Sequence, residues 1–249
     1  MTITTVTVDL WGTLLVDTPG SDNRYKGRRL ADFDALLRGD GRTFSIAKLE
    51  RAYEDSAVYL RRVWSANRDV QIAEHVKAIL RALDRELGAA PDPYLLEALV
   101  DAYGRPALVV PPTFDETARA ALTQLRARGV TLALVSNTMR TPGTVLRKLL
   151  ARAGLLDVFA HLTFSDEVGV RKPATEIFFH TLRRVGGDPA RAVHVCDDAV
   201  LDVDGAQKAG LRAVQVVGGA AHAAAPHADR TITCLGELPA AIASLEEPG

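Results

Sequence analysis

The stretch Val6-Thr7-Val8-Asp9-Leu10-Trp11-Gly12-Thr13-Leu14-Leu15 decides the fold class of this chain. It is an apolar, β-branched run that ends in one carboxylate and is then broken by a Gly-Thr pair. Buried parallel strands have this composition, and open α/β sheets carry their sites at the carboxyl ends of such strands. The stretch therefore predicts a first strand that delivers Asp9 to a site, provided that later segments supply partners for its carboxylate.

Length and composition indicate a folded protein with a sizeable core. Of the 249 residues, 47% are hydrophobic and 24% are charged, as in globular proteins. The 30 basic and 31 acidic residues nearly cancel, so no surface for nucleic acid or an anionic membrane is expected. Two cysteines make no disulfide framework, and we identify neither a signal peptide nor a transmembrane run. We expect a cytoplasmic protein without nucleic-acid or membrane partners.

The residues after the first strand predict a helical insert. Residues 17–29 are polar and rich in turn formers, so we expect a loop there. From there to about residue 105 the apolar residues recur with a helical period, and no strand pattern is present. Four helices are expected, of which the second is capped by Ser45 and the third runs from Ile72 to Leu87.

Beyond Pro106, strands and helices alternate. Single helices separate the expected strands, which are residues 131–135, 161–164, 192–195, 213–217 and 231–234. Such connections imply right-handed crossovers and a parallel, doubly wound sheet. The sequence thus predicts an α/β fold in which an α-helical domain interrupts a Rossmann-like sheet domain. The expected boundaries are 1–17 and 106–249 for the sheet domain and 18–105 for the insert.

Polar side chains follow each of the predicted core strands. Asp9 follows the first strand, Ser136 and Asn137 follow the second, Lys172 comes after the third, and Asp197 follows the strand at 192–195. Each group alone is common in turns and helix caps. Four such groups, all at carboxyl ends of parallel strands, point to a single site.

These residue types together suit phosphoryl transfer. The chemistry needs a carboxylate nucleophile, a hydroxyl, a cation and further carboxylates for a divalent metal. Asp9 and a phosphate group repel each other unless positive charge lies between them, which Lys172 and Mg²⁺ would supply. Asp197 and Asp202, with four residues between them, can present two carboxylates to the same metal ion.

The sequence resembles the haloacid dehalogenase superfamily, a large group of mostly phosphatases. The resemblance rests on Val8-Asp9-Leu-Trp-Gly-Thr13, Val135-Ser136-Asn137, Val170-Arg-Lys172-Pro173 and the acidic run from Cys196 to Gly210. It covers the whole sheet domain. By this resemblance the helical insert is similar to the family's cap, which closes over the site and selects the substrate.

The resemblance also implies roles for individual residues. Asp9 would be the nucleophile, and Ser136 and Lys172 would bind the transferring group. Mg²⁺ would be the cofactor, and the substrate would be a small phosphorylated molecule. The implied metal ligands are Asp9, the backbone carbonyl of Trp11, Asp197 and Asp202. The expected substrate-binding residues are Thr13, Asn137 and, from the start of the insert, Arg24.

Trp11 departs from the pattern of the family. Family phosphatases usually carry a second Asp there, as general acid and base, whereas an indole can neither protonate a leaving alkoxide nor activate water. Three interpretations stay open: a Mg²⁺-dependent phosphatase that uses another acid or a good leaving group, a dehalogenase-type hydrolase with an aspartyl-ester intermediate, and a non-catalytic binding protein. The acidic residues Asp197 and Asp202 resemble the Mg²⁺-dependent branch of the family, and this resemblance favours the phosphatase.

Overall fold

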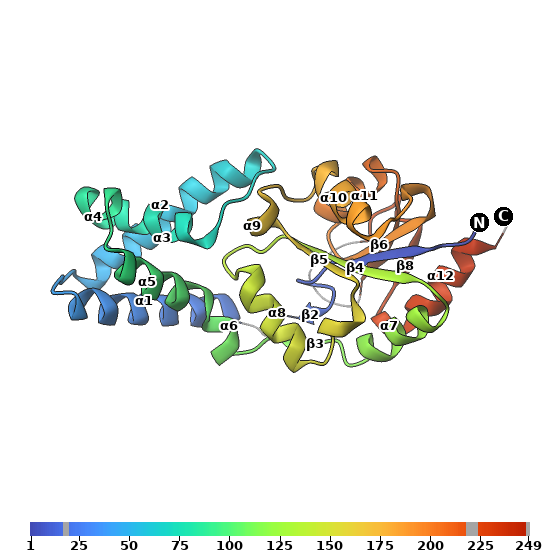
Figure 1. Ribbon diagram of the computed structural model, residues 1–249, viewed down its shortest axis with the longest axis horizontal. Helices are drawn as coiled ribbons and strands as arrows, with labels where there is room; N and C mark the ends of the chain where they lie inside the picture. The colour runs from blue at the N-terminus through green and yellow to red at the C-terminus, as the bar shows by residue number, and fades with distance from the viewer. Residues whose placement is uncertain (17–19, 218–223, 248–249) are drawn as a thin grey trace.

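The computed structural model describes residues 1–16, 20–217 and 224–247. A six-stranded sheet with helices on both faces occupies one end of the molecule, and a block of helices occupies the other (Figure 1). The strand order is β5-β4-β1-β6-β7-β8, and all neighbours pair in parallel. The strands are β1 (Thr5–Val8), β4 (Thr131–Ser136), β5 (His161–Phe164), β6 (Ala192–Cys196), β7 (Arg212–Val216) and β8 (Arg230–Ile232). The predicted α/β, Rossmann-like sheet is confirmed.

Strand β1 lies at the centre of the sheet: it pairs with β4 on one side and with β6 on the other, and all four of its residues are buried. Val8 is in register with Leu134 of β4 and Val195 of β6. The backbone N–H of Asp9 continues the ladder by donating to the carbonyl of Val195 at 2.8 Å. The residues that follow β1, β4 and β6 therefore meet at one edge of the sheet.

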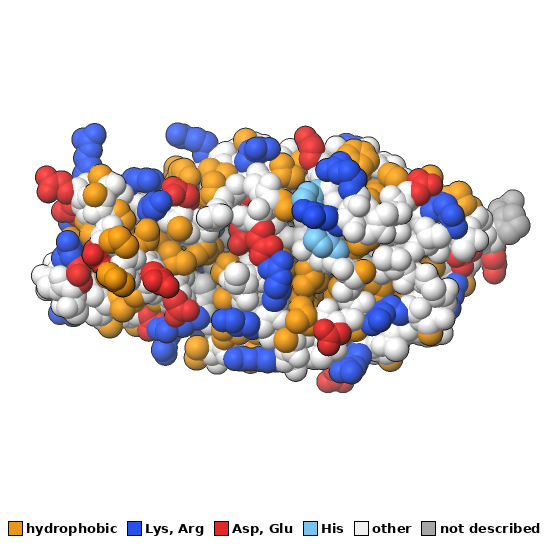
Figure 2. Space-filling model, viewed as in Figure 1, with side chains coloured by type: hydrophobic (Ala, Val, Ile, Leu, Met, Phe, Trp, Pro, Cys, Tyr) orange, Lys and Arg blue, Asp and Glu red, His pale blue; other side chains and the backbone are white. Residues whose placement is uncertain are grey.

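Helices cover both faces of the sheet (Figure 1). One face carries α10 (Thr175–Val185) and α11 (Gly205–Lys208), and the other carries α7 (Ala118–Ala127), α8 (Gly143–Arg152) and α12 (Leu238–Glu246). Shorter helical turns are α9 (Ser165–Val168), the 3₁₀ turns Leu156–Val158, Pro189–Arg191 and Leu235–Glu237, and a π-helical stretch at Ala199–Asp204. Basic and acidic side chains are interspersed on the face in Figure 2. None of the described helices is long and apolar enough to cross a membrane.

The helical block has a hydrophobic core of its own. Its helices are α1 (Ser21–Gly39), α2 (Ile46–Ser65), α3 (Ile72–Leu83), α4 (Arg85–Ala89) and α5 (Pro93–Gly104), followed by α6 (Pro106–Val109). Phe33, Val76 and Leu99 belong to a buried cluster that is separate from the cluster under the sheet. The boundary expected after residue 17 lies outside the described residues.

The loop expected over residues 17–29 is wrong from Ser21 onward, because α1 begins there. Tyr25, Arg29, Phe33 and Leu37 recur every four residues and are all buried. Because the second buried position of this stripe is Arg29 and not an apolar residue, the apolar helical pattern becomes visible only from Leu30 onward. Residues 17–19 lie outside the described part of the chain.

The single helix expected from Ile72 to Leu87 is also wrong. It breaks at Asp84, whose backbone is extended (φ −155°, ψ 127°). The carboxylate of Asp84 accepts a hydrogen bond from the backbone N–H of Leu87 at 2.9 Å and so caps α4. Aspartate competes with helix continuation in this way because its short side chain can satisfy the backbone N–H groups of a new helix start.

A second, two-stranded sheet was not expected from the sequence. Strands β2 (Leu15–Val16) and β3 (Thr113–Phe114) pair antiparallel, with Leu15 opposite Phe114. These strands belong to the two chain segments that link the sheet to the helical block. The two connections therefore lie side by side and leave the sheet domain together.

His75 is buried in the helical block, and neither ring nitrogen has a hydrogen-bond partner in the described parts of the chain. Burial lowers the pKa of His75 from 6.5 to about 3, and the nearby positive charges of Arg140 and Arg29 lower it further. The unfolded chain therefore binds a proton between pH 6.5 and pH 3 that the folded chain does not, so stability falls as the pH drops through this range.

Replacing His75 with Phe should remove this acid sensitivity. The wild-type chain should lose about 2 kcal/mol of unfolding free energy through His75 between pH 8 and pH 5. Urea unfolding at both pH values checks this, and the loss should be smaller by that amount in His75→Phe. The same replacement at the half-buried His180 should change the loss less. An unchanged loss in His75→Phe would show that His75 does not titrate as described.

Candidate active site

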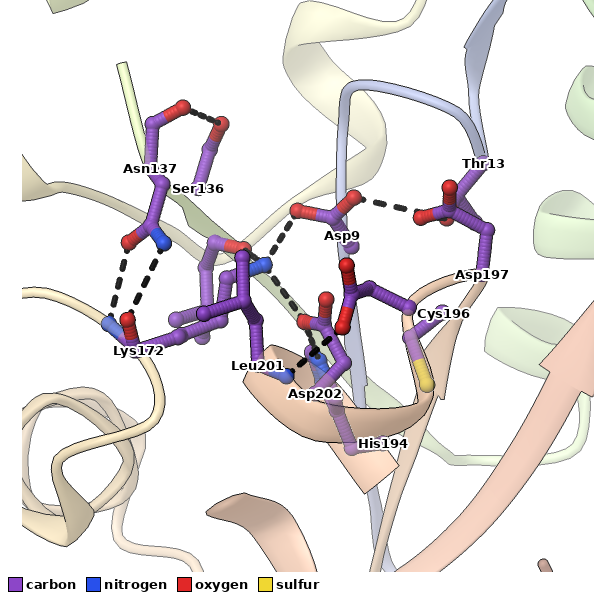
Figure 3. Close-up of polar contacts among 12 residues, drawn as sticks. Asp9, Thr13, Ser136, Asn137, Lys172, His194, Cys196, Asp197, Leu201 and Asp202 are labelled. Carbon is purple, nitrogen blue, oxygen red and sulfur yellow. Dashed lines mark hydrogen bonds and ion pairs between the residues drawn. The ribbon is translucent and has the colours of Figure 1, made fainter. Parts of the chain in front are cut away.

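The carboxyl edge of the sheet brings Asp9, Lys172 and Asp202 into contact (Figure 3). The Lys172 ammonium donates to Oδ1 of Asp9 and lies 2.5 Å from Oδ1 of Asp202. It also donates to the backbone carbonyl of Val135, at 3.2 Å. All three charged side chains are buried. The ammonium is therefore fixed between two carboxylates that come from opposite ends of the sequence.

Asp197 completes a cluster of three carboxylates. Asp9, Asp197 and Asp202 each offer an oxygen atom, and these atoms all lie within 4.8 Å of one another. The Thr13 hydroxyl lies between two of these groups, 3.4 Å from Oδ2 of Asp9 and 3.3 Å from Oδ1 of Asp197. Carboxylate oxygens are the ligands that Mg²⁺ prefers. The cluster therefore fits a divalent cation.

The electrostatics of the cluster also favour a cation. Burial raises the pKa of Asp9 to about 8; the positive charge of Lys172 lowers it, and the charges of Asp202 and Asp197 raise it. Three carboxylates share one ammonium, so negative charge is in excess when all of them are ionised. A further positive charge in this position would stabilise the ionised form of Asp9.

Gly12 makes room for Asp197. Its backbone has a positive φ of 80°, and a Cβ atom at this position would lie 2.1 Å from Oδ2 of Asp197. Any side chain at Gly12 would therefore be strained and would push the Asp197 carboxylate away from its present position.

Replacing Gly12 with Ala should weaken the binding of a divalent cation by this cluster. We expect the apparent affinity for Mg²⁺ to fall roughly 10–100-fold, as when the support of a metal ligand is lost. Isothermal titration with MgCl₂ checks this. Gly41→Ala is the matched control, because Gly41 also has a positive φ, of 77°, but has open space around it. Equal Mg²⁺ affinity in the two variants would contradict the assignment of Asp197 as a ligand.

His194 holds Asp202 from the other side, a contact that sequence reasoning missed. His194 is fully buried in β6, with Nε2 2.8 Å from Oδ1 of Asp202 and Nδ1 2.9 Å from the hydroxyl of Thr7. Burial lowers the pKa of His194. Because a carboxylate only accepts, the neutral ring donates from Nε2 and accepts at Nδ1. A histidine between valines in a core strand was the only signal in the sequence.

The other predicted site residues lie in different surroundings. Ser136 is buried at the end of β4, next to the carbonyl that Lys172 contacts. The side chain of Asn137 exchanges two hydrogen bonds with the backbone of Lys172, at 3.2 and 3.0 Å, and thus positions that residue. Arg24 is exposed on α1. Its neighbour Arg29 is buried instead.

A cavity of about 410 Å³ lies between the sheet and the helical block. The sheet side contributes Trp11, Met139, Arg140 and Thr141, and the helical side contributes Asp22, Asn23, Tyr25, Lys26, Arg29, Tyr53 and Trp64. Trp11 is half-buried, and its indole N–H has no partner within the described residues. Trp11 follows Asp9 by two residues and so links the cavity wall to the carboxylate cluster along the chain. Arg24 is outside the lining.

Comparison with known proteins identifies the family of the matched region. The model of the haloacid dehalogenase-like hydrolase family matches residues 3–210. Glyceraldehyde 3-phosphate phosphatase from Methanopyrus kandleri is 34% identical over 134 residues, which are 53% of this chain and 55% of that protein. Phosphoserine phosphatase from Thermus thermophilus is 39% identical over 105 residues, 42% of this chain and 41% of that one. The chain thus spans about half the length of these curated relatives, or less.

Solved structures match over nearly the whole chain. The 2-haloacid dehalogenase from Pseudomonas syringae pv. Tomato has a TM-score of 0.73 at 25% identity, covering 98% of this chain and 99% of that one. The HAD phosphatase from Thermococcus onnurineus has a TM-score of 0.61 at 24% identity, covering 96% and 97%. The second likeness concerns the fold alone. The helical block is thus included in both structural matches.

Proposed function

The chain belongs to the haloacid dehalogenase-like hydrolase family, and from this membership we propose that it is a Mg²⁺-dependent phosphatase acting on a small phosphorylated metabolite. The observation that carries the proposal is the cluster of Asp9, Asp197 and Asp202 around a single ammonium. A phosphate dianion approaches such an acidic cluster only with a divalent cation in place. Phosphatases among the relatives support the same activity.

In the proposed reaction a carboxylate oxygen of Asp9 attacks phosphorus, and the bond to the leaving oxygen breaks. Bound Mg²⁺, held by Asp9, Asp197, Asp202 and the backbone carbonyl of Trp11, would neutralise phosphate charge. Lys172, fixed by Asn137 and Asp202, offers its ammonium to the transferring group. Ser136 and Thr13 would donate hydrogen bonds to the phosphoryl oxygens. Water then attacks the aspartyl phosphate and releases inorganic phosphate.

Trp11 makes both proton transfers slow in this scheme. Its side chain can donate a hydrogen bond but has no ionisable group near neutral pH. A leaving alkoxide must therefore take its proton from elsewhere, and the attacking water lacks a base. We infer that substrates with good leaving groups react best and that hydrolysis of the aspartyl phosphate limits turnover.

We propose that the helical block, which the structure describes from Ser21 onward, is the cap expected over residues 18–105 and covers the site. The paired strands β2 and β3 would form the hinge. The block contacts the sheet domain through Asp69, which accepts from the Ser165 hydroxyl at 2.5 Å and whose N–H donates to the carbonyl of Gly169 at 3.2 Å. Opening of such a cap would admit substrate, and closing would exclude water from the aspartyl phosphate.

Dehalogenation of a 2-halo acid is the second candidate. Trp11 favours it, because a halide leaves without a proton and an acid at this position is then unnecessary. The likeness to the Pseudomonas syringae dehalogenase over 98% of the chain also supports it. In that reaction Asp9 would attack carbon and form an ester, and the metal site would have no role.

Product and metal dependence together separate these candidates. We expect the purified chain to release phosphate from an aryl phosphate in Mg²⁺ and to lose this activity in EDTA. Halide release from 2-chloropropionate in EDTA, without phosphate release from the aryl phosphate, would show that the chain is a dehalogenase and not a phosphatase. Failure of both reactions, with a ligand still raising the melting temperature, would indicate the third interpretation, a binding protein without catalysis.

A further inference from the structure

Three arginines lie where the helical block meets the sheet, and only Arg171 has a carboxylate, that of Asp69, acting on its charge in the described residues. Arg29 and Arg171 are 4% and 5% exposed, and Arg140 is half-buried. In the described ranges of the chain, none of the three forms an ion pair with a carboxylate, although the half-buried Arg105 and Arg147 do. Buried charges in proteins are usually paired or bound to a ligand, because an unpaired charge is costly to desolvate.

The partners of these guanidinium groups are neutral. Arg29 donates to the carbonyl of Tyr103 at 2.7 Å, the hydroxyl of Tyr53 at 3.3 Å and the carbonyl of Arg140 at 3.1 Å. Arg140 donates to the Tyr103 hydroxyl and lies over the ring of Tyr53, 4.5 Å from its centre. These contacts orient the side chains of Arg29 and Arg140 but bring no negative charge to them, whereas Asp69 offsets part of the charge of Arg171.

Arg171 is the most poorly satisfied of the three. Its guanidinium lies 4.6 Å from the centre of the Trp64 ring and contacts the sulfur of Met139, while Nη1 has no hydrogen-bond partner in the part of the chain described. Burial lowers its pKa. Trp64 and Met139 both line the 410 Å³ cavity. Arg171 therefore packs against two residues that line the cavity, and its Nη1 donor has no hydrogen-bond partner in the described residues.

Two of the arginines lie close in sequence to residues at the carboxyl edge of the sheet. Arg171 precedes Lys172, and Arg140 follows Asn137 by three residues. Arg29 and Arg140 line the cavity themselves, together with Trp11, which follows Asp9 by two residues. A molecule whose phosphate meets Asp9 and whose carbon skeleton passes Trp11 would enter this cavity, which is bordered by Lys26, Arg29 and Arg140 and by one carboxylate, Asp22. The cavity volume suits a small metabolite.

We propose that this cavity binds a second anionic group of the substrate, a carboxylate or a second phosphate. The guanidinium groups of Arg140 and Arg29 pair with this anion, Arg171 adds its charge from behind Trp64, and the rings of Tyr53 and Trp64 flank the carbon skeleton. The proposal rests on the proposed function for the position of the first phosphate. The anion site itself rests on the unpaired arginines. Arginine suits this task because its fork matches carboxylate and phosphate oxygens.

Tryptophan fluorescence reads occupancy of the cavity directly. The chain has two tryptophans, Trp11 and Trp64, and both line the cavity. The probes are glycerol 3-phosphate, 3-phosphoglycerate and glycerol 1,3-bisphosphate, which share a three-carbon skeleton and differ in the second anion. They are titrated into Asp9→Asn with Mg²⁺, because this variant should not consume them.

We expect at least one of the two doubly anionic ligands to bind about 10–100-fold more tightly than glycerol 3-phosphate. Whichever binds more tightly tells whether the second anion is a carboxylate or a phosphate. Adding Arg140→Gln or Arg171→Gln should reduce the preference at least severalfold. Arg152→Gln, on the exposed side of α8, is the control and should keep it. Circular dichroism spectra confirm that each variant is folded.

Equal affinities for the three probes, no fluorescence change with any probe, or a preference that survives both arginine variants would overturn the anion site. Phosphate release by the wild-type chain from an aryl phosphate in Mg²⁺ tests the proposed function separately. A preference among the three probes, without phosphate release from the aryl phosphate, would refute the phosphatase and leave the anion site standing. Phosphate release without a preference among the probes would overturn the anion site and leave the phosphatase standing.

Discussion

Replacing Asp9 with Asn should lower the rate of phosphate release from an aryl phosphate by roughly 10⁴-fold or more, the scale seen when a covalent nucleophile is removed. An amide has nearly the shape of the carboxylate but cannot form the aspartyl phosphate. Lys172 keeps its contacts with Asp202 and the carbonyl of Val135, so the rest of the site should persist. Steady-state kinetics in saturating Mg²⁺ measure the loss.

Two further observations make this result specific. Asp9→Asn removes a carboxyl group that is costly to ionise beside Asp197 and Asp202, so the variant without metal should melt at or above the wild-type temperature. Asp198→Asn is the control, because Asp198 lies beside Asp197 but caps a helical turn by accepting from the N–H groups of Val200 and Leu201. Activity near the wild-type level in Asp9→Asn would mean that another group is the nucleophile.

Replacing Trp11 with Asp should raise phosphate release from alkyl phosphates by about 10²–10⁴-fold, the contribution of a general acid and base. Trp11 lines the cavity two residues beyond Asp9, where a carboxyl group can reach the leaving oxygen. The gain should be smaller for aryl phosphates, because a phenolate leaves more readily without a proton. The ratio of kcat/KM between an alkyl and an aryl phosphate measures this effect.

Trp11→Phe is the matched control for the proton transfer. It removes the indole and opens a similar space but adds no acid, so it should leave the ratio unchanged. An equal gain in Trp11→Phe would mean that the indole obstructs the substrate. No gain in Trp11→Asp would mean that another group already supplies the proton, or that phosphoryl transfer is not the reaction.

The sheet and its polar edge were predictable because strand patterns are local. A β-branched run such as Thr5–Val8 predicts a buried strand. Parallel strands place their carboxyl ends at one edge of the sheet. This reasoning assigned Asp9, Lys172 and Asp197 to one place, where the structure brings them together. Their catalytic roles stay predictions.

Features that depend on tertiary contacts were not predictable. Arg29 resembles a surface charge in the sequence but is buried on α1, and Trp64 resembles core but borders the cavity. The His194–Asp202 contact and the pairing of β2 with β3 join segments whose proximity follows only from the fold. Trp11 is the opposite case: the sequence alone shows that position 11 has no acid or base, but it does not show how this changes the reaction.

Trapping the covalent intermediate tests the central claim most directly. Because Trp11 cannot activate water, the aspartyl phosphate should accumulate when an aryl phosphate is mixed with the chain in Mg²⁺. After acid quenching and proteolysis, mass spectrometry should find one phosphoryl group on the peptide that contains Asp9, and none in EDTA. An unmodified peptide despite continuing phosphate release, or a metal-independent ester on Asp9 after exposure to 2-chloropropionate, would contradict the account.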